Sequence, residues 1–171
     1  PWIVPGSAPV RAGLVARTAS GAPYYTTTTT GVKIALLDFT NPRAVRFWQA
    51  QVARALDLGG DGFMQDYGEE ILFRMHFADG ETGATMHNAY PVLYARATRE
   101  AVTHYEHAHA GRKIFFYTRA GYGGLPGSTA YESGNFPGDE TTDFSHASGL
   151  ASLTSDMLGR AVDGAYGFGT D

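Results

Sequence analysis

Two aspartates are the side chains of this 171-residue chain best placed to do chemistry. Asp66 ends the run Gly-Phe-Met-Gln-Asp, and Asp139 ends the run Asn-Phe-Pro-Gly-Asp. Each acid therefore follows a short apolar or aromatic stretch of the kind that forms a β-strand. An acid at the end of a strand faces a cleft more often than it fills a core. Two carboxyl groups on nearby strands can cleave a glycosidic bond, one as nucleophile and the other as proton donor.

The strands that carry these acids alternate with helical patterns. Asn41 followed by Pro42 is a typical helix start, with an N-cap residue and a proline in the first turn. The pair Gly59-Gly60 ends this helix. A second helix is predicted over residues 89–107, with His87-Asn88 as its cap, and a third helix, or a broken pair of helices, over residues 150–162. The apolar residues of the first helix recur on one stripe: Val45, Trp48, Val52 and Leu56.

Strands are expected in five places after residue 31, ending near Asp38, Asp66, Arg119, Asp139 and Asp171. The run 32–37 is apolar except for Lys33, and such continuity favours a strand buried on both faces of a parallel sheet. Before it, residues 11–30 read as a hairpin around a turn at 20–23, and the threonine run 26–30 suits an extended segment. A polar loop is expected over residues 73–85.

This order of strands and helices, with a polar residue after every strand, is typical of a (β/α)₈ TIM barrel, whose active site lies at the carboxyl ends of its strands. Only five strands can be counted, and a complete barrel needs at least about 200 residues. We therefore predict an α/β fold that is a partial (β/α)₈ barrel of about five units. The whole chain, 1–171, would be a single domain, with a hairpin or extended lead-in at 1–31 and β/α units at 32–171.

Composition excludes several classes of function. The net charge of −4 provides no basic surface for nucleic acid, and no apolar run reaches the roughly 18 residues of a membrane span. The chain has no cysteine, which rules out disulfides and thiolate catalysis. His104, His107 and His109 have a spacing compatible with metal ligation, but they fall at the end of a helix, where histidine is common because of the helix dipole. We predict no metal site and no cofactor.

Six stretches, in order, resemble glycoside hydrolase family 31, a family of retaining α-glycosidases. The form Asp-Tyr-Gly-Glu at residues 66–69 is similar to the bacterial branch with sulfoquinovosidases and α-xylosidases. The stretches are Asp-Phe-Thr-Asn-Pro at 38–42, Asp-Gly-Phe-Met-Gln-Asp-Tyr-Gly-Glu at 61–69, Met-His-Asn-Ala-Tyr-Pro at 86–91, Thr-Arg-Ala-Gly at 118–121, Gly-Asp at 138–139 and Thr-Asp at 170–171.

The resemblance implies roles for particular residues. Asp66 would be the nucleophile and Asp139 the general acid/base, Arg119 would bind sugar hydroxyls, and Asp171 would support that arginine or the pocket floor. Phe136 stands where the family usually has tryptophan, so an aromatic contact with substrate is kept and the indole hydrogen bond is lost. The substrate would be an α-linked sugar or sugar conjugate, and no cofactor is needed.

Plainer interpretations stand beside these. Arg119 after a buried strand could pair with an acid for structural reasons alone, and Asp38 can be explained by capping of the backbone that follows it. The resemblance also implies that sugar-binding residues lie outside residues 1–171. The alternative to an active glycosidase is therefore a catalytically silent half-barrel that assembles with itself or with a missing segment, because an open sheet leaves strand edges and an apolar face uncovered. The sequence specifies neither the sugar nor the compartment.

Overall fold

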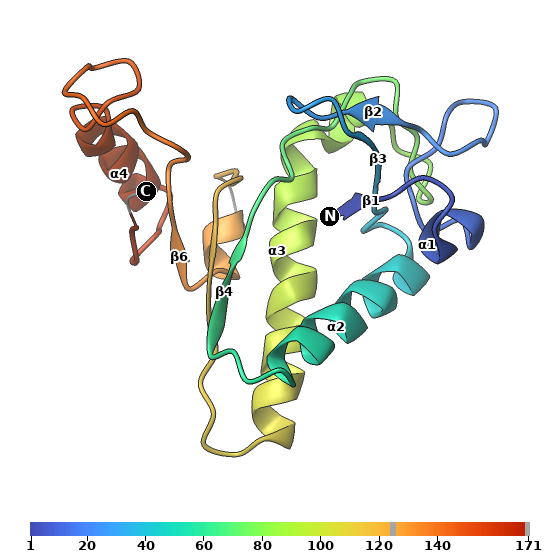
Figure 1. The fold of residues 1–171 in the computed structure, drawn as a ribbon, viewed down its shortest axis with the longest axis horizontal. Helices are drawn as coiled ribbons and strands as arrows, with labels where there is room; N and C mark the ends of the chain where they lie inside the picture. The colour runs from blue at the N-terminus through green and yellow to red at the C-terminus, as the bar shows by residue number, and fades with distance from the viewer. Residues whose placement is uncertain (124–125, 170–171) are drawn as a thin grey trace.

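The computed structural model describes residues 1–123 and 126–169 of the chain. In Figure 1 the long helix α3 runs through the middle, with the first three strands on one side of it and β4, β6 and α4 on the other. The elements in chain order are β1 (Trp2–Ile3), α1 (Ala8–Arg11), β2 (Thr26–Thr27), β3 (Lys33–Leu36), α2 (Pro42–Leu56), β4 (Gly62–Gln65), α3 (Gly83–Ala108), β5 (Phe115–Thr118), the 3₁₀ helix η1 (Ser128–Ala130), β6 (Gly134–Asn135) and α4 (Leu153–Val162).

The first sheet is antiparallel, in the order β1-β3-β2. Its central strand β3 is buried on two sides, because Ile34 and Leu36 pack into one apolar cluster while Ala35 packs into another with Val10 and Val15. The expectation that this apolar run belongs to a parallel sheet was wrong. Burial on both faces was correctly indicated, but here it comes from two apolar clusters around an antiparallel strand.

The second sheet is parallel, in the order β4-β5-β6. The segment 164–168, expected as a further strand, contributes only one parallel bridge, between Asn135 and Phe168. The α/β class is thus confirmed, whereas a partial barrel of about five β/α units is not. The described residues form three parallel strands in a sheet that is not closed.

The lead-in contains the expected turn and a short antiparallel pairing across it, where the Tyr24 amide donates to the carbonyl of Ala16 at 2.8 Å. Residues Arg17 and Pro23 form an isolated antiparallel bridge, and the Thr18 amide donates to the carbonyl of Ala22 at 2.7 Å. The chain on either side then pairs elsewhere, since Val15 bridges to Leu37 and β2 pairs with β3. The lead-in is therefore held by the first sheet more than by itself.

Helix α2 begins and ends where the sequence places it. The Asn41 side chain accepts the Arg43 amide at 2.9 Å, and Pro42 occupies the first turn. Helix α3 differs, because it begins at Gly83, six residues before the expected start. His87 and Asn88 thus lie inside the helix, and their expected capping role was wrong.

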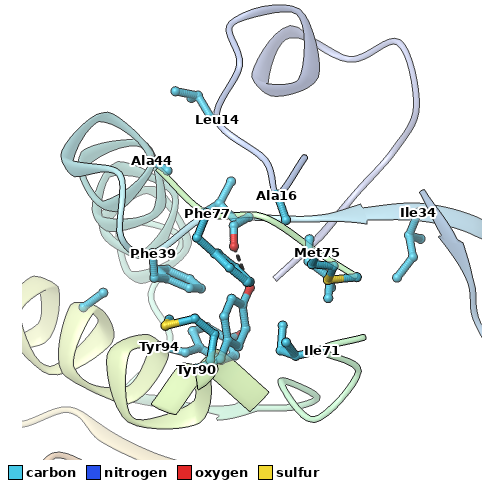
Figure 2. Packing of buried hydrophobic residues seen from close by; sticks show 14 residues of the cluster. Leu14, Ala16, Ile34, Phe39, Ala44, Ile71, Met75, Phe77, Tyr90 and Tyr94 are labelled. Atoms are coloured by element: carbon cyan, nitrogen blue, oxygen red, sulfur yellow. Dashed lines mark hydrogen bonds between the residues drawn. The ribbon is translucent and has the colours of Figure 1, made fainter. Parts of the chain in front are cut away.

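The largest apolar cluster lies between the first sheet, α2 and α3 (Figure 2). At its centre Tyr90 is fully buried and donates its hydroxyl to the carbonyl of Leu37 at 2.7 Å. Ile71, Met75 and Phe77 also pack into this cluster. They belong to the segment between β4 and α3, part of which was expected to be a polar loop. That part is a loop up to the start of α3, as expected, and most of its residues are exposed, but it is not wholly polar, because Met75 and Phe77 are buried in the core.

Candidate functional site

The register of the parallel sheet determines which residues come together at the candidate site. Gln65 pairs with Thr118, and Thr118 pairs with Asn135, so these three buried residues form one row across β4, β5 and β6. Asp66 and Arg119 each follow a member of this row in the chain. Because side chains alternate between the two faces of a strand, they project toward the opposite face, next to each other.

Arg119 joins two acids of this region. Its Nη1 lies 3.1 Å from Oδ1 of Asp66, and its Nη2 donates to Oε1 of Glu69. The backbone amide of Tyr67 donates to the same Oδ1 of Asp66 at 2.8 Å. In the part of the chain that the structure describes, Oδ2 of Asp66 has no partner. One carboxylate oxygen of Asp66 is therefore held in place, and the other is not.

Several charges act on Arg119 together. Burial lowers the pKa of its guanidinium, but the carboxylates of Glu69, Asp66 and Asp139 outweigh that effect, so the pKa is raised overall. The arginine therefore remains a cation at any physiological pH. Because Asp66 and Asp139 both act on this one group, the two acids singled out from the sequence lie in its neighbourhood.

A tight turn after β4 brings Glu69 back to Arg119. Tyr67 has a φ of 64°, the only positive φ of a non-glycine residue in the described ranges, and Gly68 follows with a φ of 118°. A Cβ atom on Gly68 would lie 3.2 Å from the ring of Tyr94, so glycine meets both a conformational and a packing demand. The Gly68 amide donates to Oε2 of Glu70 at 3.0 Å, which holds the turn closed.

A cavity of about 420 Å³ opens beside these residues. Its size falls within the range of small-molecule sites. It is lined by Arg119 and Asp139, by Tyr67, Glu69 and Glu70, by Trp2 and Ile34, and by the threonines 26–29. Asp139 is exposed. The cavity thus combines carboxylates, one cation, hydroxyls and aromatic rings, which is the mixture that a polar ligand with apolar ring faces requires.

Of the residues assigned from the sequence, one lies elsewhere and another falls outside the described ranges. Phe136 is buried, with its ring edge-on to Tyr117 at 5.6 Å, and it lines a separate cavity of about 290 Å³ with Met64 and Phe115. Its contact with a substrate remains a prediction. Asp171 lies outside the described residues, so its role also remains a prediction.

Asp38 has the structural role that was expected of it. It is 1% exposed and accepts the Thr40 amide at 3.0 Å, the Thr40 hydroxyl at 2.7 Å and the Ala78 amide at 2.8 Å. Burial raises the pKa of its carboxyl, although these hydrogen bonds oppose the change. Asp38 therefore anchors the segment between β4 and α3 to the end of β3.

The sequence did not point to the residues that surround Arg119. Tyr67 and Glu69 belong to the Asp-Tyr-Gly-Glu motif, and a glycine directly after a tyrosine at a strand end was a usable signal of a strained turn. Trp2 carries no such signal, because only the pairing of β1 with β3 brings it here. The described residues contain no group of three His, Asp or Glu side chains able to hold a metal ion, and no helix among them is long and apolar enough to span a bilayer.

Comparison with known proteins places these features in a family. Residues 8–171 match the family described as the glycosyl hydrolases family 31 TIM-barrel domain. A sulfoquinovosidase of Escherichia coli (strain K12) is 32% identical over 130 residues, which cover 75% of this chain and 18% of that protein. An α-xylosidase of Emericella nidulans is 39% identical over 71 residues, covering 41% of this chain and 9% of that protein.

Solved structures agree with the sequence comparison. A family 31 sulfoquinovosidase from E. rectale, in complex with an aza-sugar inhibitor, superposes with a TM-score of 0.84 at 28% identity, covering 95% of this chain and 24% of that one. A cycloalternan-degrading enzyme from Trueperella pyogenes, in complex with isomaltose, gives 0.81 at 25% identity, covering 97% and 22%. The chain spans less than a fifth of the two sulfoquinovosidases that it matches in sequence. Because the family match runs through the strands that carry Asp66, Arg119 and Asp139, the chain belongs to glycoside hydrolase family 31 and forms a segment of its TIM-barrel domain.

Proposed function

We propose that the protein that contains this chain is a retaining α-glycosidase, in which Asp66 is the nucleophile and Asp139 the general acid/base. The observation that carries the proposal is the geometry at Asp66. Arg119 and the Tyr67 amide both hold Oδ1, and Oδ2 has no hydrogen-bond partner in the described ranges. A nucleophilic carboxylate needs this arrangement, with one oxygen fixed and the other able to reach the anomeric carbon.

The reaction would proceed in two displacements. Oδ2 of Asp66 attacks the anomeric carbon, the bond to the leaving oxygen breaks, and Asp139 gives that oxygen its proton. Asp139, now a carboxylate, takes a proton from water as the water oxygen attacks the same carbon and releases Asp66. Two inversions give net retention, and no electron acceptor or metal is needed to balance either step. Arg119 would bind a sugar hydroxyl beside the reacting carbon.

We propose an α-linked sugar or sugar conjugate as the substrate, with a glycone related to those of the sulfoquinovosidases and α-xylosidases. Two relatives named as sulfoquinovosidases and a structural neighbour of the same name support this range. The experiment is hydrolysis of a panel of 4-nitrophenyl α-glycosides by the complete protein. The panel consists of the glucoside, xyloside, galactoside and sulfoquinovoside.

The nucleophile is tested with Asp66→Ala in the same assay. The variant should lose turnover by at least about a thousandfold, because the covalent step has no nucleophile. Added azide should restore part of the rate, since a small anion can enter the space left by the carboxylate and attack the anomeric carbon. Asp61→Ala is the matched control, because Asp61 is an exposed acid at the other end of β4. Full activity in Asp66→Ala, or a loss that azide leaves unchanged, would contradict the assignment.

One observation favours the second hypothesis, a half-barrel that assembles without catalysis. Met64 is 41% exposed and Phe115 is 52% exposed, and both lie on the face of the parallel sheet away from α2 and α3. An apolar face of this kind commonly marks a contact with another polypeptide segment. Size-exclusion chromatography of the 171-residue chain distinguishes the hypotheses. A monomer with weak apolar-dye binding would count against assembly, and activity of the complete protein would count against silence.

A further inference from the structure

The ring of Tyr67 contacts Arg119 in a way that the proposed chemistry does not use. The guanidinium carbon of Arg119 lies 4.6 Å from the centroid of the Tyr67 ring. The ring of Trp2 stacks on the same tyrosine with centroids 3.7 Å apart and an angle of 29° between the planes. Two groups this close to one centroid cannot share a face of the ring. Tyr67 is therefore sandwiched between Trp2 and Arg119.

Both outer members of this sandwich are tied to acids of the turn after β4. Arg119 binds Glu69, and Nε1 of Trp2 donates to Oε1 of Glu70 at 3.2 Å. Glu70 in turn accepts the amide of Gly68 at 3.0 Å. The sandwich and the turn therefore form one closed set of contacts, which includes both the tyrosine ring and the guanidinium.

The backbone indicates that this ring position is costly. Tyr67 adopts a left-handed conformation that bulky side chains seldom occupy, and such strain persists only where neighbouring contacts compensate for it. Asparagine or glycine would fit this φ more easily. A large aromatic residue at such a position is explained if the contacts of its ring serve the site.

We propose that Tyr67, backed by Trp2, is a positioning residue for Arg119: its ring fixes the guanidinium between Asp66 and Glu69, so that the arginine presents a preset cation to a sugar hydroxyl. The inference rests on the proposed glycosidase function. The attraction of a cation to a ring face grows stronger as water is excluded from the contact. Arg119 is 19% exposed in its side chain, so water competes only in part for the guanidinium.

The test uses a set of variants that separates the ring from the backbone strain. Tyr67→Phe keeps the ring and should retain most of the activity. Tyr67→Leu removes the ring, and Tyr67→Asn removes it while favouring the left-handed backbone. If the ring positions Arg119, both should lower kcat by roughly ten- to a hundredfold with a smaller change in KM, because a misplaced group costs mainly transition-state stabilisation. Trp2→Ala should lower kcat in the same direction by a smaller factor.

The matched control is Tyr25→Leu. Tyr25 is also half-buried and also carries a cation over its ring, Lys33 at 4.6 Å, but it does not line the cavity. Its loss should leave kcat unchanged. Circular dichroism and thermal unfolding of every variant identify those that fail to fold. Tyr67→Leu could lose activity because leucine distorts the left-handed turn locally. Tyr67→Asn still reports on the ring in that case, because asparagine fits this backbone conformation.

The outcomes separate the two proposals. If the wild-type protein hydrolyses no glycoside, the proposed function fails. If it is active and Tyr67→Asn is as fast as Tyr67→Phe, the ring is unimportant and the positioning role is overturned. If Tyr67→Phe is itself as slow as Tyr67→Leu, the hydroxyl and not the ring matters, and the positioning role is overturned as well.

Discussion

At the scale of single residues, a buried polar row lies directly beneath the candidate site. Glu132 accepts the hydroxyl of Thr118, and Nδ2 of Asn135 donates to the same hydroxyl oxygen at 3.2 Å. Within the described ranges, one oxygen each of Gln65, Glu132 and Asn135 is buried without a hydrogen-bond partner. A buried oxygen without a partner costs free energy. The row that aligns Asp66 with Arg119 therefore also lowers the stability of the fold.

Glu132 yields a prediction about pH. Burial raises the pKa of its carboxyl above the ordinary value of 4.5, and the Thr118 hydroxyl and the charge of Arg160 oppose this only in part. Between the unfolded and folded pKa values the folded state binds more protons, so the free energy of unfolding falls as the pH rises through this window. Glu132→Gln carries no such charge. Its stability relative to wild type should therefore rise from about pH 4 toward pH 7, by at most about 1.4 kcal/mol per pH unit.

Urea unfolding of both proteins at several pH values measures this difference. If the difference in unfolding free energy stays constant over this pH range, or shrinks as the pH rises, the pKa of Glu132 is not raised in the folded state.

The residue scale also shows how far sequence reasoning reached. The rule that acids at strand ends face a cleft brought out Asp66 and Asp139, and the arginine after β5 was found in the same way. Those residues depend on local pattern. Glu69 and Tyr67 depend on a left-handed turn, which the Tyr67-Gly68 pair signals without showing what lies beside it. Trp2 depends on strand pairing across the molecule, which no local pattern shows.

At the scale of elements, strand direction was harder to predict than strand existence. The run 32–37 was correctly expected to be a strand buried on both faces. A continuous apolar run indicates that both faces of the strand are buried, but it does not indicate the direction of the neighbouring strands. The two faces of β3 are buried by one cluster that includes Phe39 and another that includes Val15. Helix α2 was predicted closely because Asn41 and Pro42 act within one turn. The start of α3 was missed because it is determined by contacts with the chain before it.

Gly83 tests that last point. It opens α3, its amide donates to the carbonyl of Met75 at 2.8 Å, and a Cβ atom there would collide with the backbone of Leu72. Gly83→Ala should lower the free energy of unfolding by about 1–3 kcal/mol, because the segment before α3 must move away. Gly159 in α4 is the control, since a Cβ there meets nothing within 4 Å.

The two substitutions should change the free energy of unfolding in opposite directions. Gly159→Ala should stabilise the protein by up to about 1 kcal/mol, because alanine favours a helix more than glycine does. Denaturant unfolding of both variants measures the pair. Equal effects would mean that the close approach at Gly83 does not limit the fold.

At the scale of the whole molecule, α2 and α3 hold the two sheets together from one side. One apolar cluster joins them to the first sheet, and a second, with Val52, Val102 and Phe116, joins them to β5. Among the described residues no comparable apolar cluster covers the opposite face of the parallel sheet, where Met64 and Phe115 are about half exposed beside the cavity that they line with Phe136. The family match explains this arrangement, because the chain spans under a quarter of the family 31 structure it resembles and an unclosed sheet leaves its inner face bare.

This bare face leads to a prediction about association. Replacing Phe115 by lysine places a charge on the apolar face, where burial against a second chain would be costly. If the 171-residue chain self-associates through this face, Phe115→Lys should shift it toward the monomer in size-exclusion chromatography and reduce its binding of an apolar dye. The matched control is Phe144→Lys, because Phe144 is 81% exposed and lies in the loop after Asp139. A monomeric wild type, or an equal shift in both variants, would show that the face is not a contact surface. A shift confined to Phe115→Lys would mean that the inner face of the sheet has a specific affinity for polypeptide, which is what the closure of a barrel from separate segments requires.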